Sequence, residues 1–387
     1  MNIWFIASWW PTRVHPRNGN FVEKHARLVA REHDLTVVSV EEDPGMPPGK
    51  KPELDEQFTD GYRRIVGYYR PPSLLGQKGK LAMRAWAYHR VLRRARTVVG
   101  IPDLVHGHVL VDGGIVAAML ARRWRRPTVI TEHASRYHSD VPLSPLRRRL
   151  ARWAVRQAFL VLPVTDHLGQ SMRERHQLYG SYQTVSNVVD IQQFYPPRQR
   201  QRPGRPFRLL HVSNFTTPVK HVNRLLAVYR RLIEKFPGRF QLHVAGDGDL
   251  DELNKWVAGA GLSAPDVSIS GPHTEGEVAE IMRRADAFVL FSLLENQPVV
   301  LLEALCSGLP CVAPRVGGIP TLIQDGWSGT LITPRDEDEL LVALSNLPTQ
   351  VWNASLISEE AGGRFSERAV LEMLQTIYGN AVAEARS

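Results

Sequence analysis

Short apolar runs alternate with longer amphipathic stretches along this chain, and the alternation starts afresh in its second half. The apolar runs have the length of buried strands, and the stretches between them are long enough for crossover helices. This pattern predicts an α/β fold with parallel sheets covered by helices on both faces. We expect strands at residues 3–8, 35–40, 104–106, 127–131, 161–164, 207–212, 240–245, 267–269 and 287–290. We expect helices at residues 19–30, 81–98, 144–160, 222–236, 250–258 and 275–284.

A segment rich in Pro, Gln and Arg separates the two rounds of alternation. Because 387 residues exceed what one hydrophobic core usually covers, we expect two doubly wound domains. We place the first at residues 1–188, the linker at 189–206 and the second at 207–368. Residues 41–60 are rich in acidic residues, Pro and Gly, and are expected to form a surface loop.

The composition, 43% hydrophobic and 22% charged, is that of an ordinary globular protein. The apolar runs are too short to span a bilayer. The first six residues resemble a strand and lack the basic and apolar segments of a secretion leader, so we expect a cytoplasmic protein.

The charge is uneven. Residues 1–186 hold 29 Lys and Arg against 16 Asp and Glu, whereas the remainder holds 19 against 23. A basic first half indicates an anionic partner, such as a phospholipid surface, a lipid-phosphate acceptor or nucleic acid. The Arg-rich helix at 144–160 fits a peripheral contact with the inner face of the membrane, or a domain helix with a basic solvent face. No helix-turn-helix pattern supports nucleic acid as the partner.

Two carboxylates, Glu295 and Glu303, lie eight residues apart around the start of an apolar helical run that follows a buried strand. In α/β sheets, ligands bind where strands end and helices begin. Helical rise would separate the two carboxylates by about 12 Å, which is about the span of a nucleotide sugar. The helix N-terminus between them would face a diphosphate. The alternative is a pair of unrelated, solvated glutamates.

Three further residues stand where strands or loops lead into helices. Lys220 is suited to neutralise a diphosphate leaving group, although a surface lysine is the alternative. Gly19 would let the backbone approach a phosphate closely. His133 would hydrogen-bond a sugar or assist proton movement, unless it is a structural loop histidine. The turn at residues 246–249, Gly-Asp-Gly-Asp, is interpreted as a tight turn rather than as a metal site.

Together these residues resemble the family-4 retaining glycosyltransferases of the GT-B fold, also called group 1 glycosyltransferases. The Glu-x7-Glu pair, Gly-Gly-Ile-Pro at 317–320 and the segment 325–334 look like that family's donor-site signature. The resemblance implies two Rossmann-like domains facing across a cleft, with a C-terminal helix (369–387) completing the first domain.

The resemblance also implies roles for individual residues. Glu295 would bind donor-sugar hydroxyls, Glu303 the ribose, and Lys220 the diphosphate. His133, Glu295 and Lys220 are the expected catalytic residues. The expected donor-binding residues are Gly19, Asn214, Lys220, Arg224, Gly246, His273, Glu295, Asn296, Gln297, Pro298, Val299 and Glu303.

Two positions depart from the family pattern. Gln297-Pro298 stands where members usually have Phe-Gly, and proline has no N–H to donate to a sugar or phosphate. Asn214 stands where many members carry an Arg, so Arg224 or Lys220 would have to supply that charge.

The expected function is transfer of a hexosyl unit, with retention, from a UDP- or GDP-linked sugar to a hydroxyl of a glycan, lipid-linked or small-molecule acceptor. We expect a front-face mechanism without metal, and no cofactor besides the nucleotide sugar. A sugar-nucleotide epimerase or phosphorylase of the same fold, or a non-catalytic nucleotide-sugar-binding protein, are the alternatives.

Overall fold

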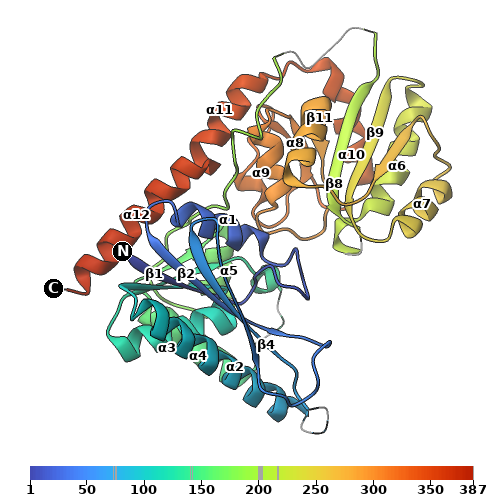
Figure 1. Cartoon of the computed structure of the whole chain (residues 1–387). Coiled ribbons are helices and arrows are strands. Elements are labelled where there is room, and N and C mark those ends of the chain that lie inside the picture. The colour runs from blue at the N-terminus through green and yellow to red at the C-terminus, as the bar shows by residue number, and fades with distance from the viewer. Residues whose placement is uncertain are drawn as a thin grey trace. The chain divides into compact units, whose positions relative to one another are not determined.

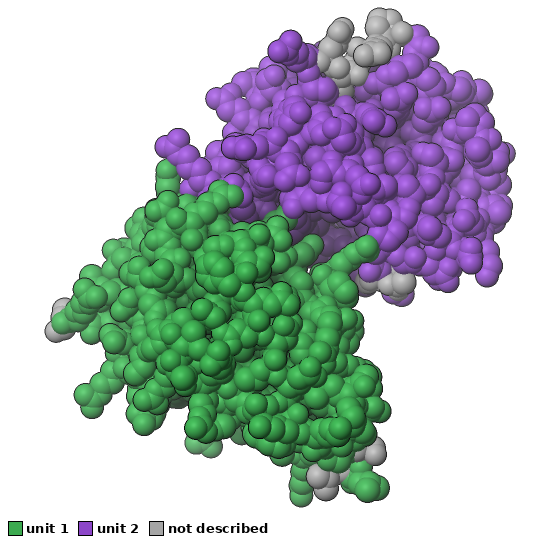
Figure 2. All heavy atoms as spheres, in the orientation of Figure 1, with its two compact units in different colours: residues 1–187, 370–387 green, residues 188–369 purple. Residues whose placement is uncertain are grey.

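The computed structural model describes residues 1–72, 74, 76–139, 141, 143–198, 204–215 and 218–386. The chain forms two compact α/β units, each with its own sheet (Figures 1 and 2). Unit 1 comprises residues 1–187 and 370–387, and unit 2 comprises residues 188–369. In the described part of the chain, no helix combines the length and apolarity needed to cross a membrane.

The sheet of unit 1 has the order β3-β4-β2-β1-β5-β6-β7, and every neighbouring pair is parallel except β3 with β4. Apart from the added edge strand β3, this is the order of dinucleotide-binding folds, and it reverses between β1 and β5. The strands are β1 (Asn2–Ala7), β2 (Asp34–Glu42), β3 (Glu53–Thr59), β4 (Tyr62–Tyr69), β5 (Leu104–His108), β6 (Thr128–Glu132) and β7 (Leu160–Pro163).

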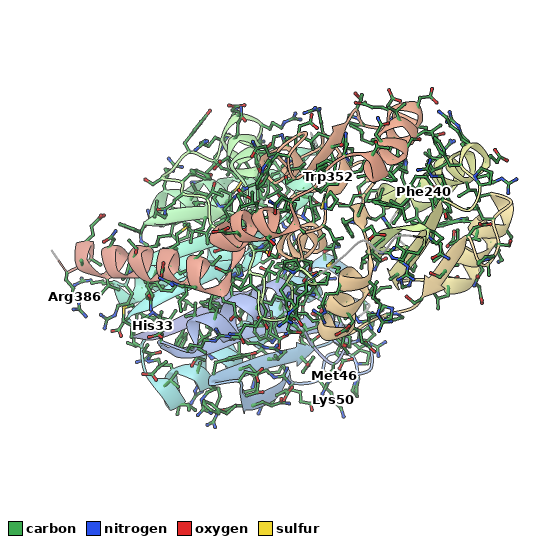
Figure 3. The ribbon with its side chains drawn as sticks, turned by 90° about the horizontal axis from the view of Figure 1, so that it is seen from above. His33, Met46, Lys50, Phe240, Trp352 and Arg386 are labelled. Carbon is green, nitrogen blue, oxygen red and sulfur yellow. The ribbon has the colours of Figure 1, made fainter. Side chains whose placement is uncertain are left out.

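Helices cover both faces of this sheet because its buried strands alternate their side chains between the two faces. Trp4, Val38 and Val105 pack on one face with residues of α2 and α3. His106 points to the other face, where Tyr378 of α12 meets it; the His33 ring also lies 6.0 Å from that of Tyr378, beside the C-terminal helix (Figure 3). The helices are α1 (Asn20–Val29), α2 (Gly76–Val99), α3 (Ile115–Trp124), α4 (Pro145–Gln157), α5 (Asp166–Glu174) and α12 (Glu367–Glu384).

The sheet of unit 2 is wholly parallel, in the order β10-β9-β8-β11-β12-β13, and reverses between β8 and β11. Its strands are β8 (Phe207–Asn214), β9 (Phe240–Asp247), β10 (Val267–Ser270), β11 (Ala287–Val289), β12 (Cys311–Pro314) and β13 (Gly329–Ile332). Its helices are α6 (Val222–Lys235), α7 (Leu250–Gly259), α8 (Glu275–Arg284), α9 (Val299–Cys306), α10 (Glu337–Asn346) and α11 (Ala354–Phe365).

Two hydrophobic cores lie on opposite faces of the second sheet. Leu209 and Val289 pack on one face with α6, α7 and α10. Leu210 and Phe288, their neighbours along the strands, pack on the other with α8, α9 and α11. Burial on both faces explains why these strands are continuously apolar in the sequence.

The expectation of a surface loop at residues 41–60 is wrong. β2 runs on to Glu42, β3 occupies Glu53–Thr59, and its partner β4 was not anticipated. The acidic residues of β3 resemble a loop in sequence, but they form ion pairs with arginines of β4, Arg63 with Glu56 at 2.5 Å and Arg64 with Asp55 at 3.2 Å. A charged edge strand of this kind also discourages pairing with other chains.

Candidate functional site

Two loops of unit 2 meet at the point where its strand order reverses. One follows β8 and contains a short turn of 3₁₀ helix (Pro218–Lys220), and the other joins β11 to α9. The backbone N–H of Leu293 donates to the carbonyl of Val219 at 2.7 Å. Beside this contact, Nζ of Lys220 donates to Oε1 of Glu295 at 2.6 Å. The fold therefore brings together a cation and a carboxylate at the edge where α/β sheets bind ligands.

The ion pair is largely shielded from water, since the Glu295 side chain is 7% exposed and that of Lys220 is 21% exposed. A buried carboxylate needs a cation or several hydrogen-bond donors, because desolvation otherwise makes the charge costly. An ammonium group carries three N–H donors, so a lysine that holds Glu295 with one of them can still bind an anion. Asn296 and Gln297, the next two residues, are also buried.

Gly317 and Gly318 lie against the backbone of the loop that carries Glu295. Gly317 has a φ of 52°, and a Cβ on it would lie 1.7 Å from the carbonyl oxygen of Glu295. The N–H of Gly318 donates to the carbonyl of Asn296 at 3.1 Å. Close backbone approach to the loop that carries Glu295 therefore requires glycine at position 317.

Helix α9 begins directly after this loop. Pro298 is its N-cap, and no side chain caps the helix start. Glu303 lies inside the helix and is buried, whereas Glu295 precedes it. The estimate of about 12 Å assumed that the chain is helical all the way from Glu295 to Glu303. In the structure only Val299 to Glu303 is helical, so the estimate does not apply to the whole interval. The first N–H groups of α9 point from the helix start, where an anion is stabilised.

Three further candidates of unit 2 lie near this edge, and two of them, Arg224 and His273, have described partners elsewhere. Arg224 is 61% exposed and lies 3.4 Å from Glu337 of α10. His273 follows β10, and its Nε2 is 2.7 Å from Oγ of Ser270. Asn214 ends β8 and is exposed. The structure therefore groups Lys220, Glu295 and residues 296–299, whereas it pairs Arg224 with Glu337 and His273 with Ser270.

The turn at 246–249 has a structural explanation. A Cβ on Gly246 would lie 1.9 Å from the carbonyl oxygen of Ser213, so glycine allows β9 to pass close to β8. Asp249 caps α7, accepting the N–H groups of Asp251 at 2.9 Å and Glu252 at 3.1 Å.

In unit 1, Gly19 is the N-cap of α1 with a φ of 74°. A Cβ on it would lie 2.4 Å from the carbonyl carbon of Trp9, so the chain's own packing also requires glycine here. His133 follows β6, and its ring packs 4.5 Å from that of Phe21 in α1 and 6.0 Å from that of His108. Burial lowers the pKa of His133 well below its usual value, which leaves the imidazole neutral.

Glu132, the residue before His133, was missed by the reasoning from sequence. Its side chain is fully buried, and Oε1 accepts the backbone N–H groups of His133 at 2.8 Å and Ala134 at 2.7 Å. Oε2 accepts the N–H of Leu110 at 2.8 Å. The only signal in the sequence was a carboxylate at the end of an apolar strand, which by itself does not show that the side chain points inward.

Comparison with known families gives two matches that together cover most of the chain. The model described as Glycosyltransferase Family 4 matches residues 21–193, and the one described as Glycosyl transferases group 1 matches residues 206–350.

Curated relatives carry related names. A D-inositol 3-phosphate glycosyltransferase of Nocardiopsis dassonvillei is 30% identical over 285 residues, which cover 66% of this chain and 64% of the relative. An N-acetyl-alpha-D-glucosaminyl L-malate synthase of Bacillus anthracis is 25% identical over 294 residues, covering 71% of this chain and 74% of that protein. The match thus spans a little under two thirds of the length of the first of these relatives.

Solved structures share the fold over almost the whole chain. A sucrose-phosphate synthase from Thermosynechococcus elongatus superposes with a TM-score of 0.72 at 16% identity, covering 99% of this chain and 100% of the other. The Anabaena protein HepE in complex with UDP superposes with a TM-score of 0.70 at 19% identity, covering 98% and 100%.

Proposed function

The chain belongs to the group 1 and family 4 glycosyltransferases and has the GT-B fold, and from this premise we propose that it transfers a sugar from a nucleotide-sugar donor to an acceptor hydroxyl. The observation that carries the proposal is the buried ion pair of Lys220 and Glu295. It lies at the reversal point of the unit 2 sheet, just before the start of α9.

In the proposed donor complex the charged groups of unit 2 bind different parts of the nucleotide sugar. Lys220 keeps one N–H on Glu295 and turns its other donors to the diphosphate, helped by the helix start of α9. Oε2 of Glu295 accepts from a hydroxyl of the sugar. Glu303 accepts from the ribose. Gly19 and His133 of unit 1 are assigned to the diphosphate and the transferred sugar.

We propose a retaining, front-face reaction. The bond between the anomeric carbon and the diphosphate oxygen breaks, and the acceptor oxygen bonds to the same face of that carbon. The acceptor's proton passes to the leaving diphosphate, so that no side chain has to act as nucleophile. Lys220 and α9 stabilise the developing negative charge, and the protein mainly positions the reactants. The proposed donor is a UDP- or GDP-linked hexose with no metal or further cofactor; HepE, solved with UDP and with UDP-glucose, supports the uridine option.

The proposed acceptor is anionic or carried by an anionic lipid. The relatives are named for D-inositol 3-phosphate and L-malate, and the first half of this chain is strongly basic. In α4, Arg147, Arg148 and Arg149 lie in the first turns without an acidic residue in the first turn. Cations there oppose the helix dipole, which favours an external anion.

Peripheral binding to anionic membrane through α4 is the lipid form of this proposal. It predicts co-sedimentation with phosphatidylglycerol vesicles but not with phosphatidylcholine vesicles. The variant with Arg148→Gln, Arg149→Gln and Arg152→Gln should lose that binding. Equal sedimentation with both kinds of vesicle would rule out the membrane contact.

The test of the donor site is a panel of UDP-, GDP- and ADP-sugars screened for thermal stabilisation. A ligand at 100 times its Kd contributes about 2.7 kcal/mol to stability, which raises the melting temperature by a few degrees. Lys220→Met and Glu295→Gln should abolish the rise. Arg231→Met should keep it, because Arg231 forms an ion pair with Asp338 on the outer side of α6. If no sugar nucleotide raises the melting temperature, the donor site is wrongly assigned.

Turnover then separates the alternatives. A glycosyltransferase forms product only when an acceptor is added, and the anomeric configuration of that product reports retention. An epimerase would convert the donor without an acceptor, and a phosphorylase would require phosphate. A binding protein would show the thermal shift without turnover.

A further inference from the structure

The loop after β5 contains two non-glycine residues in unusual backbone conformations. Val109 has φ 67° and ψ 112°, and Asp112 has φ 91° and ψ −80°. Positive φ is especially unfavourable for a β-branched residue such as valine, and such strain persists only where the surroundings impose it. The loop lies at the carboxyl end of β5, where the strand order of unit 1 reverses.

Two side chains from other elements, Glu132 of β6 and Arg84 of α2, hold this loop. Oε2 of Glu132 accepts the N–H of Leu110, the residue after the strained Val109. At the other end of the loop, the guanidinium of Arg84 in α2 lies 2.9 Å from the carboxylate of Asp112.

Glu132 also holds the loop after β6. Its Oε1 accepts the N–H groups of His133 and Ala134, so one carboxylate ties two loops together. A carboxylate has two oxygens, and both accept hydrogen bonds here. Glutamine would put an NH₂ group, which is a donor, in place of one of them and against a backbone N–H. Burial raises the pKa of Glu132. Within the residues that the structure describes, no cation forms an ion pair with this carboxylate. A buried carboxylate is costly for stability alone, which points to a positional role.

We propose that Glu132 is a positioning residue for the acceptor side of the reaction. Its carboxylate fixes His133 relative to the strained Val109–Leu110 backbone, and Arg84 fixes the far end of the same loop at Asp112. The carboxyl edge of the unit 1 sheet thereby presents a preformed surface to the acceptor. This inference rests on the proposed glycosyl transfer.

Glu132→Gln tests it while keeping the size of the side chain. We expect kcat/KM for the acceptor to fall about 10- to 100-fold, the effect of losing a charged hydrogen bond. The thermal shift by the sugar nucleotide should change by less than about twofold, because Lys220, Glu295 and the start of α9, to which most of the donor is assigned, are unchanged. His133 is assigned to the transferred sugar alone, the group that the acceptor attacks, so its displacement should act mainly on the acceptor step. Glu132→Asp keeps two acceptor oxygens and should restore part of the activity.

Asp286→Asn is the matched control. Asp286 is also a buried carboxylate that accepts a backbone N–H, that of Arg208 at 2.8 Å, and it pairs with Arg205. It precedes β11, at the opposite edge of the unit 2 sheet from the site. Its loss should lower the melting temperature without changing the ratio of the acceptor and donor KM values.

Arg84→Met releases the other end of the loop and covers the case in which Glu132→Gln does not fold. It should also lower kcat/KM selectively for the acceptor. If both variants leave the acceptor constants unchanged in an active enzyme, or change donor and acceptor constants equally, the positioning role is overturned while the glycosyltransferase proposal stands.

Hydrogen exchange gives a readout that does not depend on turnover. The amides of Leu110 and His133 should exchange faster in Glu132→Gln than in the wild type, and at the wild-type rate in Asp286→Asn. Unchanged protection would refute the inference even if no sugar transfer is found. Faster exchange together with an inactive wild type would overturn both the acceptor role of Glu132 and the proposed function.

Discussion

Lys220 and Glu295 form an ion pair across 2.6 Å although 75 positions separate them in the chain. Each was a candidate on separate grounds, a cation before one helix and a carboxylate before another. The two loops that carry them are joined by a backbone hydrogen bond from Leu293 to Val219. The backbone contact between the two loops therefore positions the ion pair, which distinguishes it from a pair of mobile surface charges.

Breaking the pair should destabilise unit 2. Lys220→Met leaves a buried carboxylate without its partner, and Glu295→Gln leaves a partly buried lysine without its counter-charge. We expect each to lower the free energy of unfolding by about 2–3 kcal/mol in denaturant titrations. The double variant should lose less than the sum of the two, because the first change already removes the interaction. Additive losses would mean that the two charges do not interact.

The pair of Arg224 and Glu337 provides the comparison. Arg224 is 61% exposed and lies 3.4 Å from Glu337. Solvent screens such pairs, so Arg224→Ala should cost less than about 1 kcal/mol.

Gly317→Ala should displace the loop that carries Glu295. The new Cβ would overlap the carbonyl oxygen of Glu295 at 1.7 Å. We expect a loss of stability well above the roughly 1–2 kcal/mol of a left-handed alanine, and a raised KM for the donor. Gly326→Ala is the control, since Gly326 has a φ of 76° and nothing within 4 Å of a Cβ. It should show the strain alone, with the donor KM unchanged.

Pro298→Ala should strengthen donor binding. Pro298 precedes the helix start of α9 and has no N–H, whereas an alanine would add one donor facing the anion site. One added hydrogen bond of about 1 kcal/mol would lower the donor KM about fivefold. Pro348→Ala, at the start of the 3₁₀ turn Leu347–Thr349, removes a comparable ring and should leave the donor KM unchanged. An equal effect of both substitutions would contradict the role of the missing N–H.

Unit 1 should lose stability in mild acid. His25, His106, His108 and His133 cluster on one face of its sheet, with the His106 and His108 rings stacked at 4.2 Å. Burial lowers the pKa of all four, so the folded state stays neutral where the unfolded chain takes up protons. Their stabilisation is complete above roughly pH 6.5 and is lost below it, by up to about 1.4 kcal/mol per pH unit for each histidine.

Melting curves between pH 7.5 and 5 measure this effect. The raised pKa values of Glu132 and Glu41 act in the opposite direction, since the folded state then binds the extra protons. They are two carboxylates against the four clustered histidines, and burial also lowers the pKa of His33 and His167 in the same unit. Both ring nitrogens of His108 are buried, with no hydrogen-bond partner among the described residues. His108→Leu should therefore make the pH dependence shallower by about 1.4 kcal/mol per pH unit. An unchanged slope would show that His108 is already protonated in the folded protein.

The sequence was most informative where burial is complete. Both faces of the unit 2 sheet are covered, so strands such as β8 and β9 appear as continuous apolar runs bounded by turns. The polar edge strand β3 gave the opposite signal, because its acidic residues face arginines of β4 that become neighbours only in the hairpin.

By itself the sequence determined the α/β class, most of the buried strands, several of the helices, and the candidates Lys220, Glu295 and His133, because periodicity and turn residues act locally. The tertiary structure decided which candidates meet. It paired Lys220 with Glu295, paired Arg224 with Glu337 at the surface, and turned Glu132 inward onto two loops. Strand order and backbone approach set these contacts, and both depend on residues that lie far apart in the chain.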